Sequence, residues 1–125
     1  MIIADMEAGL EHLSRSTTRA SDVMLVVAEP YYKSLETAGR VKALATELGI
    51  PATYAVANKV RTPAEAQAIQ TFCAKHGLEI VATIPYDDQV AEASQAPGAP
   101  LDLYPDSAAV KALAELAAKF RTMLN

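Results

Sequence analysis

The sequence has little of what usually carries metal or disulfide chemistry. It contains one cysteine, Cys73, two histidines and no tryptophan. A single cysteine can neither close an internal disulfide nor form a multi-cysteine zinc site, so we expect no metal centre and a reducing, cytoplasmic location.

Positive charge and long apolar runs are also scarce. Eleven Lys and Arg residues stand against fifteen Asp and Glu residues, which gives a net charge of −4. This balance argues against a dedicated nucleic-acid-binding protein, which normally carries a basic stripe. No apolar run approaches the roughly 18 residues of a membrane span. Residues 1–5 do not resemble the basic start of a signal peptide, so we expect neither a membrane partner nor secretion.

What the sequence does contain is an alternation of two kinds of segment within 125 residues, of which 51% are hydrophobic. Short aliphatic runs occur at residues 2–4, 23–28, 53–57 and 79–84. The last three are apolar at successive positions, which is typical of parallel strands buried on both faces. Segments of helical period lie between them. The pattern predicts a single α/β domain over residues 1–125, a three-layer, partial Rossmann-like parallel sheet of about four strands flanked by helices.

Two of the expected helices have clear ends. One begins at Ser34 and ends before Gly49. The next begins at Thr62, where Thr62-Pro63-Ala64-Glu65 forms a capping box with proline at the first helical position, and it ends at Gly77. Its apolar stripe places Cys73 on the inner face of the helix.

The C-terminal third predicts less regular structure before a long helix. A short helix is expected after Asp87 or Asp88, and residues 96–100 are expected to form a loop. Asp106 is predicted to cap the final helix. The side chains of that helix expected to face the core are Val110, Leu113, Leu116 or Ala117, Phe120 and Leu124.

Polar groups follow each of the four predicted strands. Asp5, Glu29, Asn58 and Asp87 stand at or just after the strand ends. Ligands of open parallel sheets bind beyond the carboxyl ends of the strands, so the four side chains predict a site at that edge. The alternative is structural, because an acid after a strand often only caps the next helix and an asparagine there often serves a turn.

The strings around these positions resemble a known family. Residues 5–13, Asp-Met-Glu-Ala-Gly-Leu-Glu-His-Leu, resemble the Walker B and switch II segment of the MinD/ParA/nitrogenase-iron-protein class of ATPases. The string looks closest to the CooC type, the nickel-insertion ATPases of carbon monoxide dehydrogenase maturation. Residues 25–30, 56–60 and 84–87 are similar, in the same order, to that family's next strand, its nucleotide-base strand and its base-side loop.

The resemblance implies roles for five residues. Asp5 would be the catalytic acid that holds magnesium through water and senses the γ-phosphate. Gly9 would be the switch II glycine, whose backbone can approach the phosphate closely. Asn58 would hydrogen-bond the adenine edge, and Pro85 and Tyr86 would lie near the base. ATP and Mg²⁺ are therefore the implied cofactors.

The sequence departs from the family in one decisive respect. The phosphate-binding motif G-x-x-x-x-G-K-[ST] needs a lysine and a Ser or Thr after its second glycine, and none of the five glycines here is followed by that pair. The C-x-C pair of the nickel-handling members is also missing, and Cys73 alone does not replace it. The chain resembles the carboxyl-terminal half of such an ATPase, a truncated homologue expected to lack ATP hydrolysis by itself.

Two other functional hypotheses stay open. In the first, the chain is a non-enzymatic interaction module that docks to a full-length ATPase or a metalloenzyme. In the second, it is a small-molecule-binding domain of flavodoxin-like or receiver-like type. The reading frame upstream of Met1 would separate a truncation from an independent protein.

We also expect residues 2–4 to pair with residues 23–28, and a homodimer to cover the apolar surface that the missing phosphate-loop strand leaves.

Overall fold

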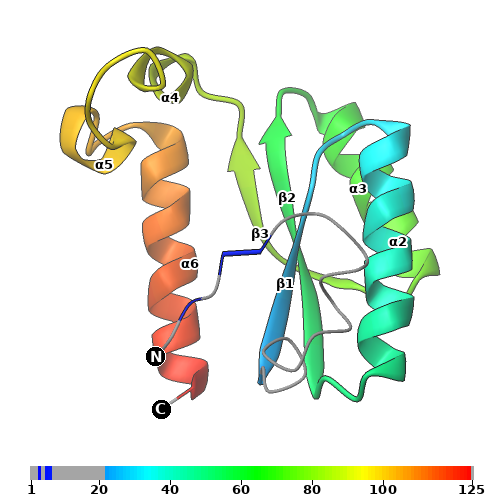
Figure 1. The fold of residues 1–125 in the computed structure, drawn as a ribbon. Helices are drawn as coiled ribbons and strands as arrows, with labels where there is room; N and C mark the ends of the chain where they lie inside the picture. The colour runs from blue at the N-terminus through cyan, green and yellow to red at the C-terminus, as the bar shows by residue number, and fades with distance from the viewer. Residues whose placement is uncertain (1–2, 4, 7–21, 125) are drawn as a thin grey trace.

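The computed structural model describes residues 3, 5, 6 and 22–124. Over these residues the chain forms an α/β fold with a three-stranded parallel sheet in the order β1-β2-β3. Helices α2 and α3 lie on one face of the sheet and α6 lies on the other, which makes three layers (Figure 1). The predicted α/β class and parallel sheet are confirmed. That one domain spans residues 1–125 stays a prediction.

The sheet consists of β1 (Val23–Ala28), β2 (Ala52–Val60) and β3 (Glu79–Pro85). The prediction of a fourth strand at residues 2–4 is wrong at Ile3, because this residue is 83% exposed and lies outside any strand. Residues 2 and 4 lie outside the described part of the chain. A strand needs a ladder partner, and among the described residues β1 pairs with β2 alone, so the expected pairing of Ile3 with β1 does not occur.

The larger core lies between the sheet and helices α2 (Tyr32–Glu47) and α3 (Pro63–Lys75). Helix α3 starts as predicted, because Thr62 Oγ1 accepts a hydrogen bond from Glu65 N at 3.1 Å and Glu65 Oε2 accepts one from Arg61 N at 3.0 Å. On its inner face Ile69 and Cys73 are fully buried. The prediction of Cys73 as a core residue is confirmed. Helix α2 begins two residues earlier than expected, at Tyr32.

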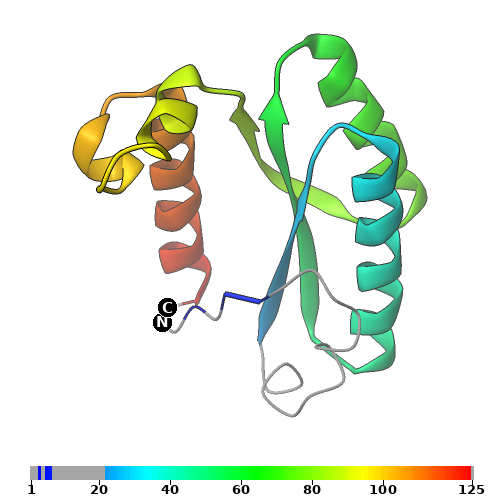
Figure 2. The ribbon, with the colours of Figure 1, turned by 45° about the horizontal axis from the view of Figure 1, so that its top comes forward.

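Helix α6 (Ala108–Leu124) covers the other face of the sheet, alongside β3 (Figure 2). Two predictions about it are wrong. Its cap is Ser107, whose Oγ accepts a hydrogen bond from Val110 N at 3.3 Å, and not Asp106. Leu113 is 51% exposed and Leu124 is 45% exposed, so neither faces the core. The core side chains of this helix are Ala109, Ala112, Leu116 and Phe120, with Val110 also buried.

Two short helices, α4 (Asp88–Ala93) and α5 (Pro100–Leu103), connect β3 to α6. Helix α4 lies where it was predicted. The expected loop over residues 96–100 ends one residue early, because Pro100 is the first residue of α5. Within the described ranges, no helix is both long and apolar enough to cross a membrane.

Candidate functional site

The carboxyl end of the sheet is shaped by a bulge in β2. Ala57 pairs with Thr83 and Val60 pairs with Pro85, so β2 contains one more residue than β3 between these two pairs. Lys59, inside the bulge, has a φ of 55°, a left-handed conformation that costs a non-glycine residue about 1 kcal/mol. Bulges of this kind re-aim side chains and are common beside functional sites.

The bulge brings the end of β2 against the loop that follows β1. Lys59 Nζ lies 2.8 Å from Glu29 Oε1, and Tyr31 Oη donates a hydrogen bond to Glu29 Oε2 at 2.9 Å. Ser34 Oγ accepts a hydrogen bond from Glu29 N at 2.8 Å. The bond from Lys59 holds the pKa of Glu29 below its usual value. The same carboxylate raises the pKa of Lys59 and of Tyr31, so the pair is an ionised link between β1 and β2.

A second contact joins β2 to the loop after β3. Tyr86 N donates a hydrogen bond to Val60 O at 2.9 Å, which extends the ladder past the end of β3. The guanidinium carbon of Arg61 lies 4.1 Å from the centroid of the Tyr86 ring, within the range of a cation–π contact. Tyr86 is 37% exposed. An aromatic ring and a guanidinium plane therefore lie together at the carboxyl edge.

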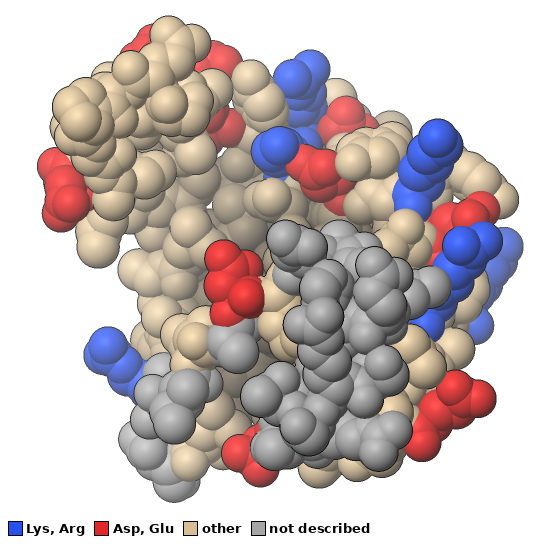
Figure 3. All heavy atoms as spheres, in the orientation of Figure 1, with Lys and Arg blue, Asp and Glu red and all other residues tan. Residues whose placement is uncertain are grey.

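The base-side residues expected from the family resemblance fall on neighbouring strands. Asn58 is half-buried in the β2 bulge, and Pro85 ends β3 opposite Val60. Tyr86 follows directly. Acidic and basic side chains lie side by side over this end of the sheet (Figure 3). The structure thus brings Asn58, Pro85 and Tyr86 to one edge.

Asp87, the fourth polar residue of the predicted edge, has a structural role. Its Oδ1 accepts a hydrogen bond from Gln89 N at 2.9 Å and its Oδ2 accepts one from Ala109 N at 3.0 Å. The backbone N–H of Ala109 is the main reason that the pKa of Asp87 lies below its usual value. The side chain caps α4 and holds the first turn of α6 by a hydrogen bond, which agrees with the alternative that an acid after a strand serves as a helix cap.

The phosphate side of the expected site is not assembled by the described residues. Asp5 is exposed and lies outside regular structure, and Gly9 lies outside the described residues. No group of three or more His, Cys, Asp or Glu side chains that could hold a metal ion is found in the part of the chain that the structure describes. Asp5 is thus the one residue expected on the phosphate side that the described part of the chain contains, and no carboxylate cluster accompanies it there. Burial raises the pKa of Cys73, which makes its thiol unreactive.

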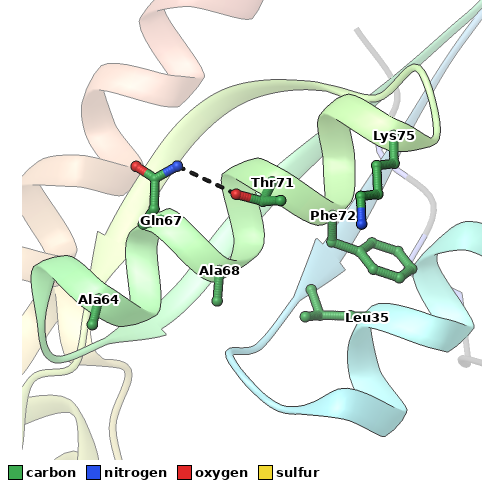
Figure 4. Close-up of a pocket in the computed structure, with 7 residues that line it drawn as sticks. All are labelled: Leu35, Ala64, Gln67, Ala68, Thr71, Phe72 and Lys75. Atoms are coloured by element: carbon green, nitrogen blue, oxygen red, sulfur yellow. Dashed lines mark hydrogen bonds between the residues drawn. The ribbon is translucent and has the colours of Figure 1, made fainter.

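A shallow open groove of about 470 Å³ lies between α2 and α3 (Figure 4). In it, Gln67 Nε2 donates a hydrogen bond to Thr71 Oγ1 at 3.3 Å, and Lys75 is its one charged side chain. The groove has no arrangement of groups for catalysis. It is lined by Leu35, Ala64, Gln67, Ala68, Thr71, Phe72 and Lys75.

Three side chains at the carboxyl edge were not predicted from the sequence: those of Tyr31, Lys59 and Arg61. The sequence held a signal for Lys59, because Glu29 and Lys59 have opposite charges and each follows an aliphatic run, residues 23–28 and 53–57, that predicts a parallel strand. No local signal marks the stacking of Arg61 on Tyr86, since the two residues are far apart in the chain.

Comparison with curated proteins finds ATP-binding relatives. An uncharacterized ATP-binding protein of Methanocaldococcus jannaschii is 40% identical over 116 residues, which cover 93% of this chain and 44% of that protein. The carbon monoxide dehydrogenase accessory protein CooC of Rhodospirillum rubrum is 36% identical over 104 residues, covering 83% of this chain and 39% of that protein. The chain thus spans less than half the length of these relatives. No protein-family profile matches it.

Solved structures show the same fold. The MinD cell division protein of Aquifex aeolicus has a TM-score of 0.71 at 19% identity, with 83% of this chain and 45% of that chain covered. A ParA family ATPase from Chlorobium tepidum has a TM-score of 0.64 at 25% identity, with 78% and 40% covered. These similarities show that the chain shares the fold of these proteins over most of its length.

Proposed function

The chain belongs to the CooC and MinD/ParA class of ATP-binding proteins, and we propose that it supplies the nucleobase side of an ATP site. The observation that supports this proposal is the meeting of Asn58, Pro85 and Tyr86 at the carboxyl ends of two paired strands. Relatives that are ATP-binding by name align over this part of the chain.

The chemistry of these residues suits a purine. The amide of Asn58 offers both donors and an acceptor to the edge of a base, and the ring of Tyr86 offers a face on which a base can stack. When ATP is bound, Mg²⁺ would neutralise part of the negative charge of its triphosphate. In this proposal Asp5 is the acid of the Walker B type, and Gly9 is the glycine near the γ-phosphate.

We expect the 125-residue chain by itself to bind Mg-ATP more weakly than about 1 μM and to show no steady ATP hydrolysis. The reason is the missing lysine loop, because preorganised donors at the β- and γ-phosphates supply most of the stabilisation of phosphoryl transfer. Isothermal titration calorimetry with Mg-ATP and a phosphate-release assay measure the two quantities.

Two results would contradict this expectation. One is a submicromolar dissociation constant for Mg-ATP. The other is steady turnover that the Asp5→Ala variant abolishes, because that would place a working phosphate site in this chain. Asp102→Ala, which removes an exposed acid on α5, is the matched control for the loss of one carboxylate.

The relative named for carbon monoxide dehydrogenase suggests the biological setting. CooC is described as an accessory protein of that enzyme. On this basis we propose that this chain also serves the maturation of a metalloenzyme, with nickel as the cargo and the metalloenzyme or a full-length ATPase as its partner. The non-enzymatic interaction module stays the alternative.

An apolar face of β1 supports assembly into a homodimer. Val27 is 59% exposed and Leu25 is 39% exposed, while Val26 and Ala28 between and after them are buried under α2 and α3. Among the described strands β1 lies at the edge of the sheet, and an edge strand with exposed aliphatic side chains favours pairing with another chain. We propose that a second copy covers this face.

Light scattering tests the dimer. We expect a mass above that of the 13.3 kDa monomer at high concentration, and a shift toward the monomer for Val27→Lys. Leu101→Lys is the matched control, because Leu101 is 64% exposed on α5, away from β1. A monodisperse monomer of the unchanged chain at high concentration would rule out the dimer.

A further inference from the structure

The side chain of Arg61 contacts an aromatic ring at the carboxyl edge. The Arg61 guanidinium lies over the Tyr86 ring at 4.1 Å. The carboxylates nearby have other partners: Glu29 binds Lys59 and Tyr31, and Glu65 Oε2 accepts from the backbone N–H of Arg61. The backbone of Arg61 is therefore held by the capping box, while its side chain is exposed and lies against an aromatic face.

We propose that Arg61 and Tyr86 form a clamp that takes a planar nucleobase between the guanidinium and the phenol ring. This inference rests on the proposed nucleobase site and names Arg61 as a positioning residue in it. Every nucleobase has a π-face, and both an aromatic ring and a guanidinium plane stack on such faces. The contact between Arg61 and Tyr86 places both groups of this clamp beside each other at the carboxyl edge.

A base can enter the clamp if the Arg61 guanidinium moves away from the Tyr86 ring. Stacked planes lie roughly 3.5–4 Å apart, so a base between the two groups needs about twice the present separation. Tyr86 is tied to β2 by its backbone bond to Val60 O, which fixes the backbone from which the ring projects. Arg61 lies just before the cap of α3 and has a long, exposed side chain, so its guanidinium is the group that moves to admit a base.

The contacts around the clamp also explain why Arg61, and not Lys59, is the residue that stacks on the base. Lys59 is fixed at 2.8 Å from Glu29 Oε1, and its left-handed backbone belongs to the bulge. Arginine stacks through a planar, weakly hydrated group, whereas lysine presents a compact and strongly hydrated charge. A clamp on a base therefore needs the arginine.

The experiment is an NMR titration of the chain with millimolar Mg-ATP, with ribose 5-phosphate as a ligand that has the charge but no base. We expect Arg61→Ala to weaken ATP binding about three- to fivefold and to leave ribose 5-phosphate binding unchanged. Arg61→Lys should weaken ATP binding nearly as much, although it keeps the charge. Tyr86→Ala should weaken it about tenfold or more.

The matched control is Arg40→Ala, which removes an exposed arginine from an ion pair with Glu36 on α2. Tighter ATP binding by Arg61→Ala would overturn the clamp, because Arg61 would then only occupy the place of the base. Equal weakening of both ligands, or full rescue by Arg61→Lys, would also overturn it in favour of simple charge attraction. If ATP shifts no resonance of Asn58, Tyr86 or their neighbours, the nucleobase site itself fails, and the clamp with it.

Discussion

Replacing Phe120 by alanine is expected to lower the free energy of unfolding by about 3–5 kcal/mol. Phe120 is 6% exposed, and its ring meets that of Tyr54 edge to face at a centroid distance of 6.2 Å. This contact fixes α6 to β2 as well as to β3. Removing the ring leaves a cavity on the face of the sheet that has only one covering helix among the described elements.

Urea unfolding followed by circular dichroism measures this loss, with Leu113→Ala as the matched control. Leu113 lies on the same helix and is 51% exposed, so its truncation should cost at most about 1 kcal/mol. If Phe120→Ala does not fold, Phe120→Leu should give a smaller loss in the same direction. Equal losses for Phe120→Ala and Leu113→Ala would contradict the position of α6.

Replacing Ile69 by alanine is expected to cost about 2–5 kcal/mol. Ile69 is fully buried between α3 and the sheet, where it belongs to the larger core cluster with Val26, Ala55 and Cys73. Three methylene or methyl groups are lost, and close-packed neighbours cannot collapse fully into the space. The conservative change Ile69→Val should cost only about 0.5–1.5 kcal/mol.

The same urea experiment tests this graded loss. Gln67→Ala is the matched control on α3, because Gln67 is outside the buried stripe and bonds only weakly to Thr71. It should change stability by no more than about 0.5 kcal/mol. A loss below about 1 kcal/mol for Ile69→Ala would contradict the burial of this face of α3.

Local rules were sufficient wherever the determining groups are close in sequence. Thr62 and Glu65 cap α3 because the groups involved are close in sequence: Thr62 Oγ1 accepts from the N–H of Glu65, and Glu65 Oε2 accepts from the N–H of Arg61, one residue before the cap. Buried strands of Val, Ile and Ala predicted the parallel sheet in the same way. The carboxyl-edge position of Asn58, Pro85 and Tyr86 followed from the strand ends and from the family resemblance.

Local rules failed where two neighbouring residues offer equal choices. Asp106 and Ser107 are both good caps, and Ser107 has the role because Asp87 holds the N–H of Ala109 and so sets where α6 begins. A helical stripe likewise fits Leu113 or Ala112, and the strand against which α6 packs decides which of them is buried.

Residue types at short spacing, or a continuous string of residues, were enough to predict the α/β class, the start of α3, the buried Cys73 and the family. The fold was needed to see the bulge at Lys59, its ion pair with Glu29 and the stacking of Arg61 on Tyr86. These contacts join segments that are far apart in the chain, so they form only once β1, β2 and β3 have paired.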